Sequence, residues 1–184
     1  MNFVKRTLSM TLVLWLLSAF LYAKDPASER YRYLMLLHNK IRQQQQLLPL
    51  QWSSQLARHA QEWADYLAVK NQCRMKHRPL TGVYRRIYGE NILWASPRRW
   101  LSSGGVEIQP LSVHDVVSAW IDEEQHYDYA SNHCQTGEQC GHYTQIVWRS
   151  SRFMGCGMTL CPDLGQLWVC NYDPPGNYEG EKPY

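Results

Sequence analysis

Apolar side chains recur at the spacing of an α-helix in two stretches near the start of the chain. The first runs from Glu29 to Gln46, just before Pro49, and its repeating positions are Tyr31, Leu34, Met35, His38 and Ile41. The second begins after Ser53, and its repeating positions are Leu56, Ala60, Trp63, Ala64 and Leu67. We predict a helix in each stretch, with the apolar stripe facing the core.

A third helix is predicted after Ser112, because Ser112 and Asp115 have the spacing of a capping box. Its broad inner face would carry Val113, Val116, Val117, Trp120, Glu123, Glu124 and Tyr127. This helix therefore turns carboxylates toward a side that should be buried.

The polarity pattern changes to a period of two further along the chain, which is typical of strands. Residues 142–148 alternate, with His142, Thr144, Ile146 and Trp148 on one side and Tyr143, Gln145 and Val147 on the other. Two more strand-like runs cover 157–160 and 167–171, so we predict an antiparallel sheet. The Ser, Gly and Pro content of residues 94–110 predicts a long surface loop. Together these elements predict a layered α+β domain.

The first 23 residues have the layout of a secretory signal peptide. Lys5 and Arg6 precede an apolar run over residues 8–20, and the small residue Ala23 follows. The run is shorter than the roughly 20 residues of a membrane-spanning helix, and no second apolar run follows, so no stable membrane span is expected. We predict cleavage after Ala23 and export, to a bacterial periplasm or to the extracellular space. An uncleaved anchor is the alternative, because Leu21 is large for its place before the cut.

Charge and cysteine content limit the kinds of partner and crosslink expected in the exported part. The whole chain has a formal net charge of +3, and the loss of Lys5 and Arg6 lowers it to +1. A near-neutral domain gives no electrostatic reason to expect nucleic acid as a partner. All six cysteines lie in the exported part, where disulfides are favoured over a metal cluster, although spacing alone does not choose the pairs. Residues 24–184 suit one domain.

Five sequence motifs resemble those of the CAP superfamily, which comprises the cysteine-rich secretory, antigen five and pathogenesis-related class one proteins. The motifs are HNKIR at 38–42, LQWSSQLARHAQEWA at 50–64, YGEN at 88–91, CGHYTQIVW at 140–148 and CNYDPPGNY at 170–178. Among the members, the motifs resemble the plant-type pathogenesis-related class one proteins in particular. The resemblance implies a single CAP domain, also called an SCP domain, over residues 24–184. It would fold as a disulfide-stabilised three-layer α-β-α sandwich with an antiparallel central sheet.

The resemblance also implies a shared cavity and a set of disulfides. The cavity residues of the family fall on His77, Glu90, Glu123 and His142. Glu124 stays an alternative to Glu123, because helical periodicity alone does not separate them. The cysteine pairs of related proteins would be Cys73 with Cys161, Cys134 with Cys140, and Cys156 with Cys170.

Two imidazoles and two carboxylates suit a divalent ion such as zinc, which accepts nitrogen and oxygen ligands. We take His77 and His142 as candidate metal ligands, and a carboxylate could then act as a general base toward a bound water. The alternative is that the four residues form structural His–Glu pairs without any ligand. The other histidines are expected at the surface or in local hydrogen bonds: His38, His59, His114, His126 and His133. No serine or cysteine is left as an obvious nucleophile, so the sequence does not support acyl transfer and no catalytic residue is assigned.

By resemblance, we expect a secreted, non-enzymatic protein of defence or host interaction that binds a small lipid, such as a sterol or fatty acid, or a protein partner. This interpretation requires no cofactor, and zinc is the only candidate cofactor. A metal-dependent hydrolase is the first alternative. The second is a precursor of a signalling peptide, because residues 174–184 (PPGNYEGEKPY) resemble a segment that some plant members release. A tail packed across the sheet is the competing interpretation of that segment.

Overall fold

The computed structural model describes residues 26–102 and 104–184, so the predicted signal peptide, residues 1–23, lies outside the described part. The helices of this part are α2 (Pro26–Gln44), α3 (Ser54–Lys70), α4 (Val113–Ile121), the 3₁₀-helix η1 (Asp122–His126) and α5 (Gly141–Ile146). The strands are β1 (Gln51–Trp52), β2 (Gly89–Ala95), β3 (Arg98–Arg99), β4 (Val106–Glu107), β5 (Tyr127–Asp128), β6 (His133–Cys134), β7 (Phe153–Leu160) and β8 (Gln166–Asp173). None of the described helices is long and apolar enough to cross a membrane.

The central sheet has four strands in the order β1-β7-β8-β2. The two strands predicted at 157–160 and 167–171 are confirmed as β7 and β8, which pair antiparallel, and β2 pairs antiparallel with β8. One part of the prediction needs correction, because β1 runs parallel to β7 and makes the sheet mixed. A strand of two residues carries no alternating pattern, so the sequence offered no sign of it.

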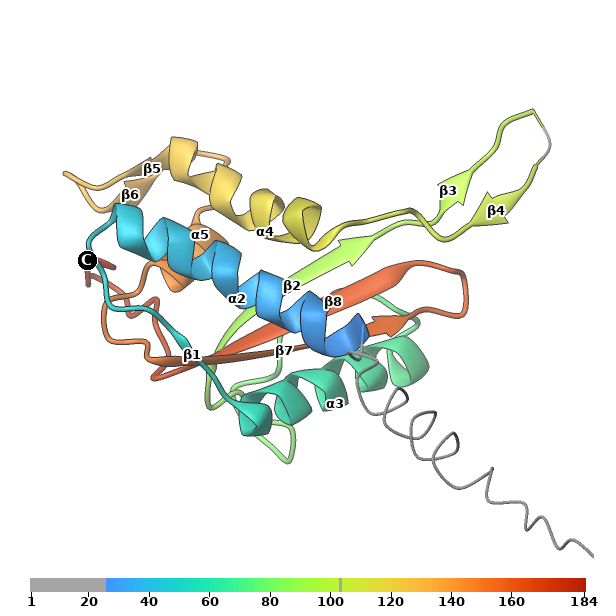
Figure 1. Ribbon diagram of the computed structural model, residues 1–184, viewed down its shortest axis with the longest axis horizontal. Coiled ribbons are helices and arrows are strands. Elements are labelled where there is room, and N and C mark those ends of the chain that lie inside the picture. Colours follow the sequence, from blue (N-terminus) through green and yellow to red (C-terminus); the bar gives the residue numbers. More distant parts are fainter. Residues whose placement is uncertain (1–25, 103) are drawn as a thin grey trace, which may run out of the picture.

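Helices cover both faces of this sheet, and the three-layer α-β-α sandwich is confirmed (Figure 1). On one face, α2, α4 and α5 bury a core that includes Leu34, Val116, Val117, Trp120, Tyr143, Ile146, Trp168 and Tyr172. On the other face, α3 buries Ala60, Trp63, Ala64 and Leu67 against Ile92, Leu167 and Val169. Alternate residues of β8 thus serve opposite cores, as the two faces of a strand require.

The helix α3 packs closely on the sheet because its sequence and that of β7 fit each other. Its predicted stripe is buried, and the Ser53 hydroxyl accepts a hydrogen bond from the Leu56 amide at the start of the helix, 3.3 Å away. Opposite lies a glycine of β7, and a Cβ added to Gly155 would lie only 2.2 Å from the Ala57 amide nitrogen. A side chain at this position would therefore push the helix off the sheet.

The predicted strand over residues 142–148 is wrong, because the chain forms the helix α5 there. Tyr143, Ile146 and Val147 are buried, and their spacing is that of one helical face. In so short an apolar run, a period of two and a period of 3.6 fit almost equally well. The choice is made by contacts from elsewhere in the fold, which are described below.

The third predicted helix is confirmed in its first half only. Ser112 and Asp115 form the reciprocal capping box at the start of α4. The α-helix ends at Ile121, and Glu123 and Glu124 lie on the 3₁₀-helix η1 instead. The predicted loop at 94–110 also contains more structure than expected, since it includes the end of β2 and the hairpin β3–β4, which projects from the body in Figure 1.

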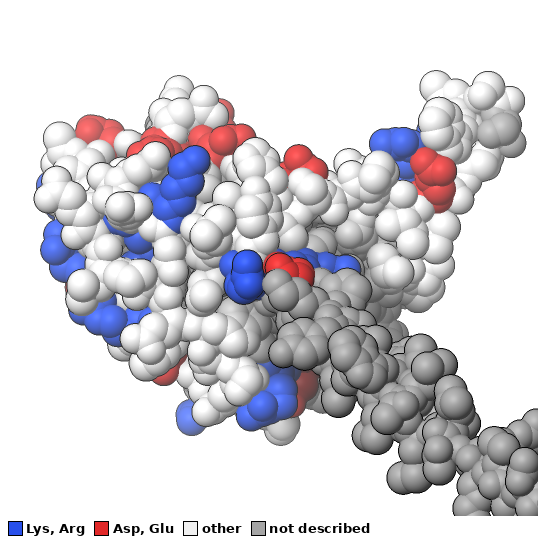
Figure 2. Space-filling model, viewed as in Figure 1, with Lys and Arg blue, Asp and Glu red and all other residues white. Residues whose placement is uncertain are grey.

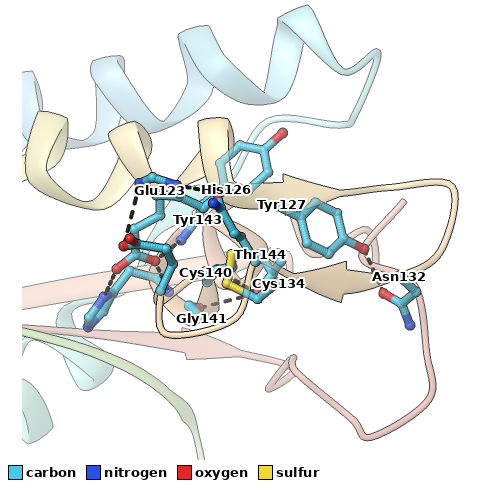
Figure 3. The surroundings of a disulfide bond; sticks show 12 residues. Glu123, His126, Tyr127, Asn132, Cys134, Cys140, Gly141, Tyr143 and Thr144 are labelled. Carbon is cyan, nitrogen blue, oxygen red and sulfur yellow. Dashed lines mark hydrogen bonds and ion pairs between the residues drawn. A yellow bond between two sulfur atoms is a disulfide. The ribbon is translucent and has the colours of Figure 1, made fainter.

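Three disulfides join Cys73 to Cys161, Cys134 to Cys140 and Cys156 to Cys170, which are the pairs that the resemblance implies. Cys156 and Cys170 are paired neighbours on β7 and β8. The disulfide of Cys134 and Cys140 connects β6 to the residue that precedes α5 (Figure 3). This crosslink therefore fixes the entry to α5.

The C-terminal tail packs on the domain, but not across the sheet as the sequence suggested. The Arg149 amide donates to the Pro183 carbonyl at 2.6 Å. The ring of Tyr184 stacks on that of Tyr129 with centroids 4.7 Å apart, and its hydroxyl lies 3.2 Å from the Tyr143 hydroxyl. The tail is thus held beside α5 and the hairpin β5–β6.

Candidate functional site

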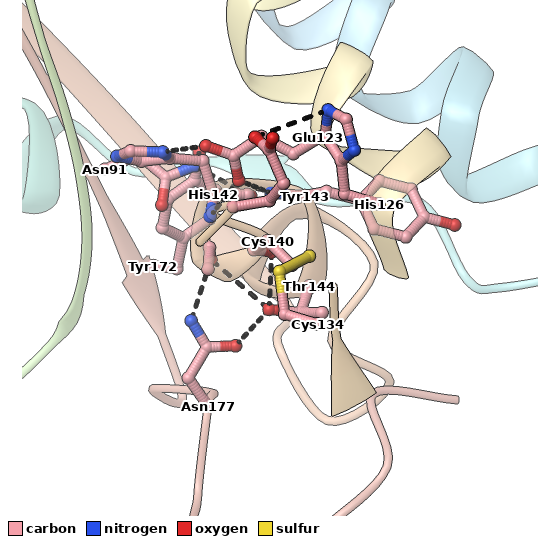
Figure 4. Close-up of polar contacts among 12 residues, drawn as sticks. Asn91, Glu123, His126, Cys134, Cys140, His142, Tyr143, Thr144, Tyr172 and Asn177 are labelled. Carbon is pink, nitrogen blue, oxygen red and sulfur yellow. Dashed lines mark hydrogen bonds and ion pairs between the residues drawn. A yellow bond between two sulfur atoms is a disulfide. The ribbon is translucent and has the colours of Figure 1, made fainter. Parts of the chain in front are cut away.

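His142 and Glu123 form one of the two His–Glu pairs among the four predicted cavity residues, and we call it the core pair. The Glu123 carboxylate accepts hydrogen bonds from the His142 imidazole Nδ1 at 2.5 Å and from the His142 and Tyr143 amides at 2.8 and 3.2 Å (Figure 4). These amides belong to the first turn of α5, and the preceding residue, Cys140, provides no side-chain cap. Glu123 therefore caps α5 from a different element, and its negative charge suits the positive end of the helix. This contact from outside the segment favours a helix over the predicted strand.

Glu124 faces another set of partners. Its Oε1 accepts a hydrogen bond from the Tyr143 hydroxyl at 2.9 Å and from the Gln45 side chain at 3.1 Å. Burial is the main cause that raises the pKa of the Tyr143 phenol, so this hydroxyl stays protonated and acts as a donor. The geometry thus pairs Glu123, and not Glu124, with His142.

His77 and Glu90 form the second pair, which we call the edge pair because Glu90 lies on β2, an edge strand of the sheet. Oε1 of Glu90 accepts from the His77 Nδ1 at 2.8 Å and from the Arg78 amide at 3.0 Å. The His77 side chain is 48% exposed, whereas that of Glu90 is fully buried. Oε2 of Glu90 is buried without a hydrogen-bond partner among the described residues.

The four residues therefore occur as two separate pairs. Both imidazoles donate through Nδ1, which leaves Nε2 as the nitrogen available to a ligand. Within residues 26–102 and 104–184, however, no group of three or more His, Cys, Asp or Glu side chains is placed to hold a metal ion. A protein zinc site takes three or four ligands, so an ion held by the two histidines alone would need water or a carboxylate to complete its coordination.

A buried hydrogen-bond chain reaches the core pair from α2. His38 is fully buried, and its Nδ1 donates to the Leu34 carbonyl at 2.8 Å. Its Nε2 accepts from the Tyr172 hydroxyl at 2.9 Å, and Asn91 donates both to that hydroxyl, at 3.2 Å, and to the His142 carbonyl, at 3.0 Å. Burial lowers the pKa of His38 to about 4 and keeps it neutral, as this donor and acceptor pattern requires. His38 was expected at the surface or in a local hydrogen bond; it makes the local bond, to the Leu34 carbonyl, and is buried.

Arg42 has a structural role that the sequence did not predict. Its side chain is fully buried and donates to the carbonyls of Ile146, Trp148 and Ser151 at 2.9, 2.8 and 3.1 Å. Burial lowers its pKa to about 10, so it remains charged near neutral pH. Arg42 thus supports the end of α5, while Glu123 caps its start. Both His38 and Arg42 lie in the HNKIR motif, which was the available signal.

A large surface cavity lies away from both pairs. It is a groove of about 780 Å³ along the outer side of α2, which we call the α2 groove. Its apolar lining comes from Tyr33, Met35, Leu36, Leu47 and Pro49, and its polar lining from Glu29, Arg32, Asn39, Lys40 and Gln43. This surface was not predicted, because the apolar stripe of α2 indicates only a helix that packs on the core.

Comparisons with known proteins agree with the fold and the motifs. The cysteine-rich secretory protein family, CAP, matches residues 35–172. A pathogenesis-related protein PR-1 of Medicago truncatula is 42% identical over 139 residues, which cover 75% of this chain and 69% of the relative. Pathogenesis-related protein 1 of Arabidopsis thaliana is 40% identical over 147 residues, which cover 80% and 78%.

Solved structures show the same fold at lower identity. Venom allergen-like protein 4 of Schistosoma mansoni superposes with a TM-score of 0.61 at 23% identity, over 83% of this chain and 92% of that one. A second structure, determined with Zn²⁺, superposes with a TM-score of 0.62 at 22% identity, over 85% of each chain. From its motifs, its disulfides, its layers and these matches, the chain belongs to the cysteine-rich secretory protein family, CAP.

Proposed function

We propose that this protein is a secreted, non-enzymatic defence protein that binds a small amphipathic lipid in the α2 groove. The names of its relatives support secretion and defence, since they are cysteine-rich secretory and pathogenesis-related proteins. The α2 groove is the single observation that supports the ligand. Its volume falls in the range of roughly 300–1,000 Å³ that is usual for small-molecule sites.

The lining of the α2 groove matches a molecule with one apolar and one charged part. Tyr33 and Leu36 are large apolar side chains that stand exposed on a helix whose opposite face is already buried. Arg32 and Lys40 lie along the same groove and offer positive charge, which Glu29 of the lining, 3.7 Å from Arg32, partly offsets. A fatty acid carboxylate can pair with these cations, whereas a sterol hydroxyl gains less from them. The lining therefore favours a fatty acid over a sterol.

Displacement of a fluorescent fatty acid from the mature protein tests this proposal, with unlabelled fatty acid and cholesterol as competitors. We expect Leu36→Glu to weaken binding by about tenfold or more, because the variant puts a negative charge where the apolar chain would lie. The matched control is Val69→Glu, which places the same charge at an exposed position on α3. This control should bind the probe as the wild type does.

Two results would count against the proposal. If Leu36→Glu binds the probe unchanged, the ligand lies elsewhere and the α2 groove is not the site. If the wild type binds neither lipid, the lipid function fails, and a protein partner becomes the leading candidate. Preferential displacement by cholesterol would overturn the choice of fatty acid.

The two His–Glu pairs are assigned a structural role in this proposal, and no cofactor is required. A metal-dependent hydrolase would need the pairs to meet at one ion, and no group of three or more such ligands is placed to hold one within residues 26–102 and 104–184. Release of residues 174–184 as a peptide would have to break the contacts of Pro183 and Tyr184 with the domain. These contacts support a tail that stays bound.

A further inference from the structure

The segment that joins α3 to β2 concentrates positive charge. Between Asp65 and Glu90 the sequence contains no acidic residue and six basic ones: Lys70, Arg74, Lys76, Arg78, Arg85 and Arg86. We call residues 71–88 the basic loop; of its five Lys and Arg side chains, only that of Arg78 is buried. A chain with a net charge of +3 thus places much of its positive charge on one exposed loop.

The basic loop has a fixed shape. The Arg86 amide donates to the Pro79 carbonyl at 2.6 Å and closes residues 79–86 into a compact turn. The Arg78 guanidinium lies 4.9 Å from the centre of the Trp63 ring, on α3, and the edge pair ties the loop to β2. The loop is therefore a preformed surface, and little ordering is needed when it binds a partner.

Large apolar side chains stand at the tip of the basic loop. Leu80 is 74% exposed and Val83 is 96% exposed, and Met75 and Ile87 are exposed as well. Single exposed apolar side chains are ordinary on a protein surface. Here five of them, Tyr84 included, lie among four exposed cations in one short segment, a combination that suits a surface lying on lipid headgroups.

We propose that the basic loop docks on the surface of an anionic lipid bilayer. Its exposed cations match the charge of the headgroups, while Leu80 and Val83 enter the boundary between headgroups and acyl chains. A soluble polyanion would bind the cations but would leave the apolar tip in water. It would therefore account for the charge of the basic loop but not for its exposed apolar side chains. This docking is independent of a ligand in the α2 groove. The groove lies along α2, whereas the basic loop joins α3 to β2.

Cosedimentation of the mature protein with vesicles tests the charge contribution. The vesicles are phosphatidylcholine alone or phosphatidylcholine mixed with phosphatidylglycerol. We expect binding to the mixed vesicles only, and we expect Arg85→Gln/Arg86→Gln to weaken it by roughly tenfold or more. The matched control is Arg98→Gln/Arg99→Gln, which removes two adjacent charges from hairpin β3–β4, where Glu107 lies 3.4 Å from Arg98 and blue and red side chains meet in Figure 2. This control should bind as the wild type does.

A second variant separates insertion from simple charge attraction. Leu80→Ser/Val83→Ser keeps every charge of the basic loop, and we expect it to weaken vesicle binding by roughly tenfold. Its matched control is Leu101→Ser/Val106→Ser, since both of these side chains are exposed on the hairpin. Thermal unfolding of each variant should match the wild type, because none of the replaced side chains is buried.

Several outcomes would overturn the docking proposal. Equal losses in the two arginine variants would mean that net charge alone attracts the protein. Unchanged binding of Leu80→Ser/Val83→Ser would remove the apolar tip from the mechanism. Retention on a sulfated polysaccharide without vesicle binding would replace the bilayer by a polyanion. Leu36→Glu should still bind vesicles, so a failure of the groove and a failure of the loop can be told apart.

Discussion

The core pair and the edge pair contain the same two side chains but have different surroundings. In the core pair, His142 and Glu123 are only 18% and 13% exposed, and the carboxylate also caps a helix. In the edge pair, a buried Glu90 holds a half-exposed His77 at the root of the basic loop. One pair thus supports the fold, and the other anchors a surface.

The difference shows that the chemical identity of a pair does not determine its role. The core pair is joined through Asn91 and Tyr172 to His38 on α2, so it shares the stability of the sheet and of that helix. The edge pair depends on one loop and one strand. Perturbations of the core pair should therefore cost much more stability than perturbations of the edge pair.

Acid should produce the largest effect, through His38. In the unfolded chain this histidine takes up a proton near pH 6.5, whereas in the folded protein burial lowers its pKa to about 4. Between pH 6.5 and pH 4 the unfolded state binds more protons than the folded state. The stability that depends on a neutral His38 is therefore fully present above pH 6.5 and is lost as the pH falls toward 4. The loss should reach about 3 kcal/mol. Urea unfolding across this pH range measures it.

The control for the acid effect is His38→Gln, which has no group that titrates in this range. Its free energy of unfolding should be lower than that of the wild type near neutral pH and should fall less steeply on acidification. If the free energy of unfolding falls equally with pH in the two proteins, His38 is not the buried titrating group. The connection from α2 to the core pair would then contribute little to stability.

Removal of the core carboxylate should have the next largest effect. Glu123→Ala leaves two amides of α5 and the His142 imidazole without their acceptor, so we expect a loss of about 2 kcal/mol in the free energy of unfolding. The neighbouring Glu124→Ala removes the same charge but only side-chain contacts, and should cost less than about 1 kcal/mol. Urea unfolding compares the two, and a greater loss for Glu124→Ala would reverse the assignment of the pair.

Features that depend on one segment could be predicted from the sequence, whereas features that depend on contacts between distant segments could not. The stripe of α3 and the Ser112–Asp115 box were predictable, because each signal lies within one segment. The helix α5 was not, since its cap comes from Glu123, 19 residues before His142. Three further acceptors of Arg42, the carbonyls of Ile146, Trp148 and Ser151, lie more than 100 residues away, and no local pattern indicates them.

The candidate site was predictable as a set of residues but not as an arrangement. The resemblance named the four residues, and helical periodicity left Glu123 and Glu124 open, because it assumed that α4 continued through both. The chain tightens into η1 at Asp122 and turns the two carboxylates toward different partners. The α2 groove was not predicted, because one buried stripe on a helix does not indicate whether the opposite side of the helix lines a groove.

A zinc titration should produce the smallest effect, and it tests whether the two pairs are separate at all. We expect no saturable heat when zinc is added to the oxidised mature protein in a calorimeter, since neither pair supplies the three ligands of a protein zinc site. Stoichiometric binding that disappears in His77→Ala/His142→Ala would mean that the free Nε2 atoms of both imidazoles reach one ion. The core and edge pairs would then be two halves of one centre, and the basic loop, which His77 anchors, would be positioned by the metal.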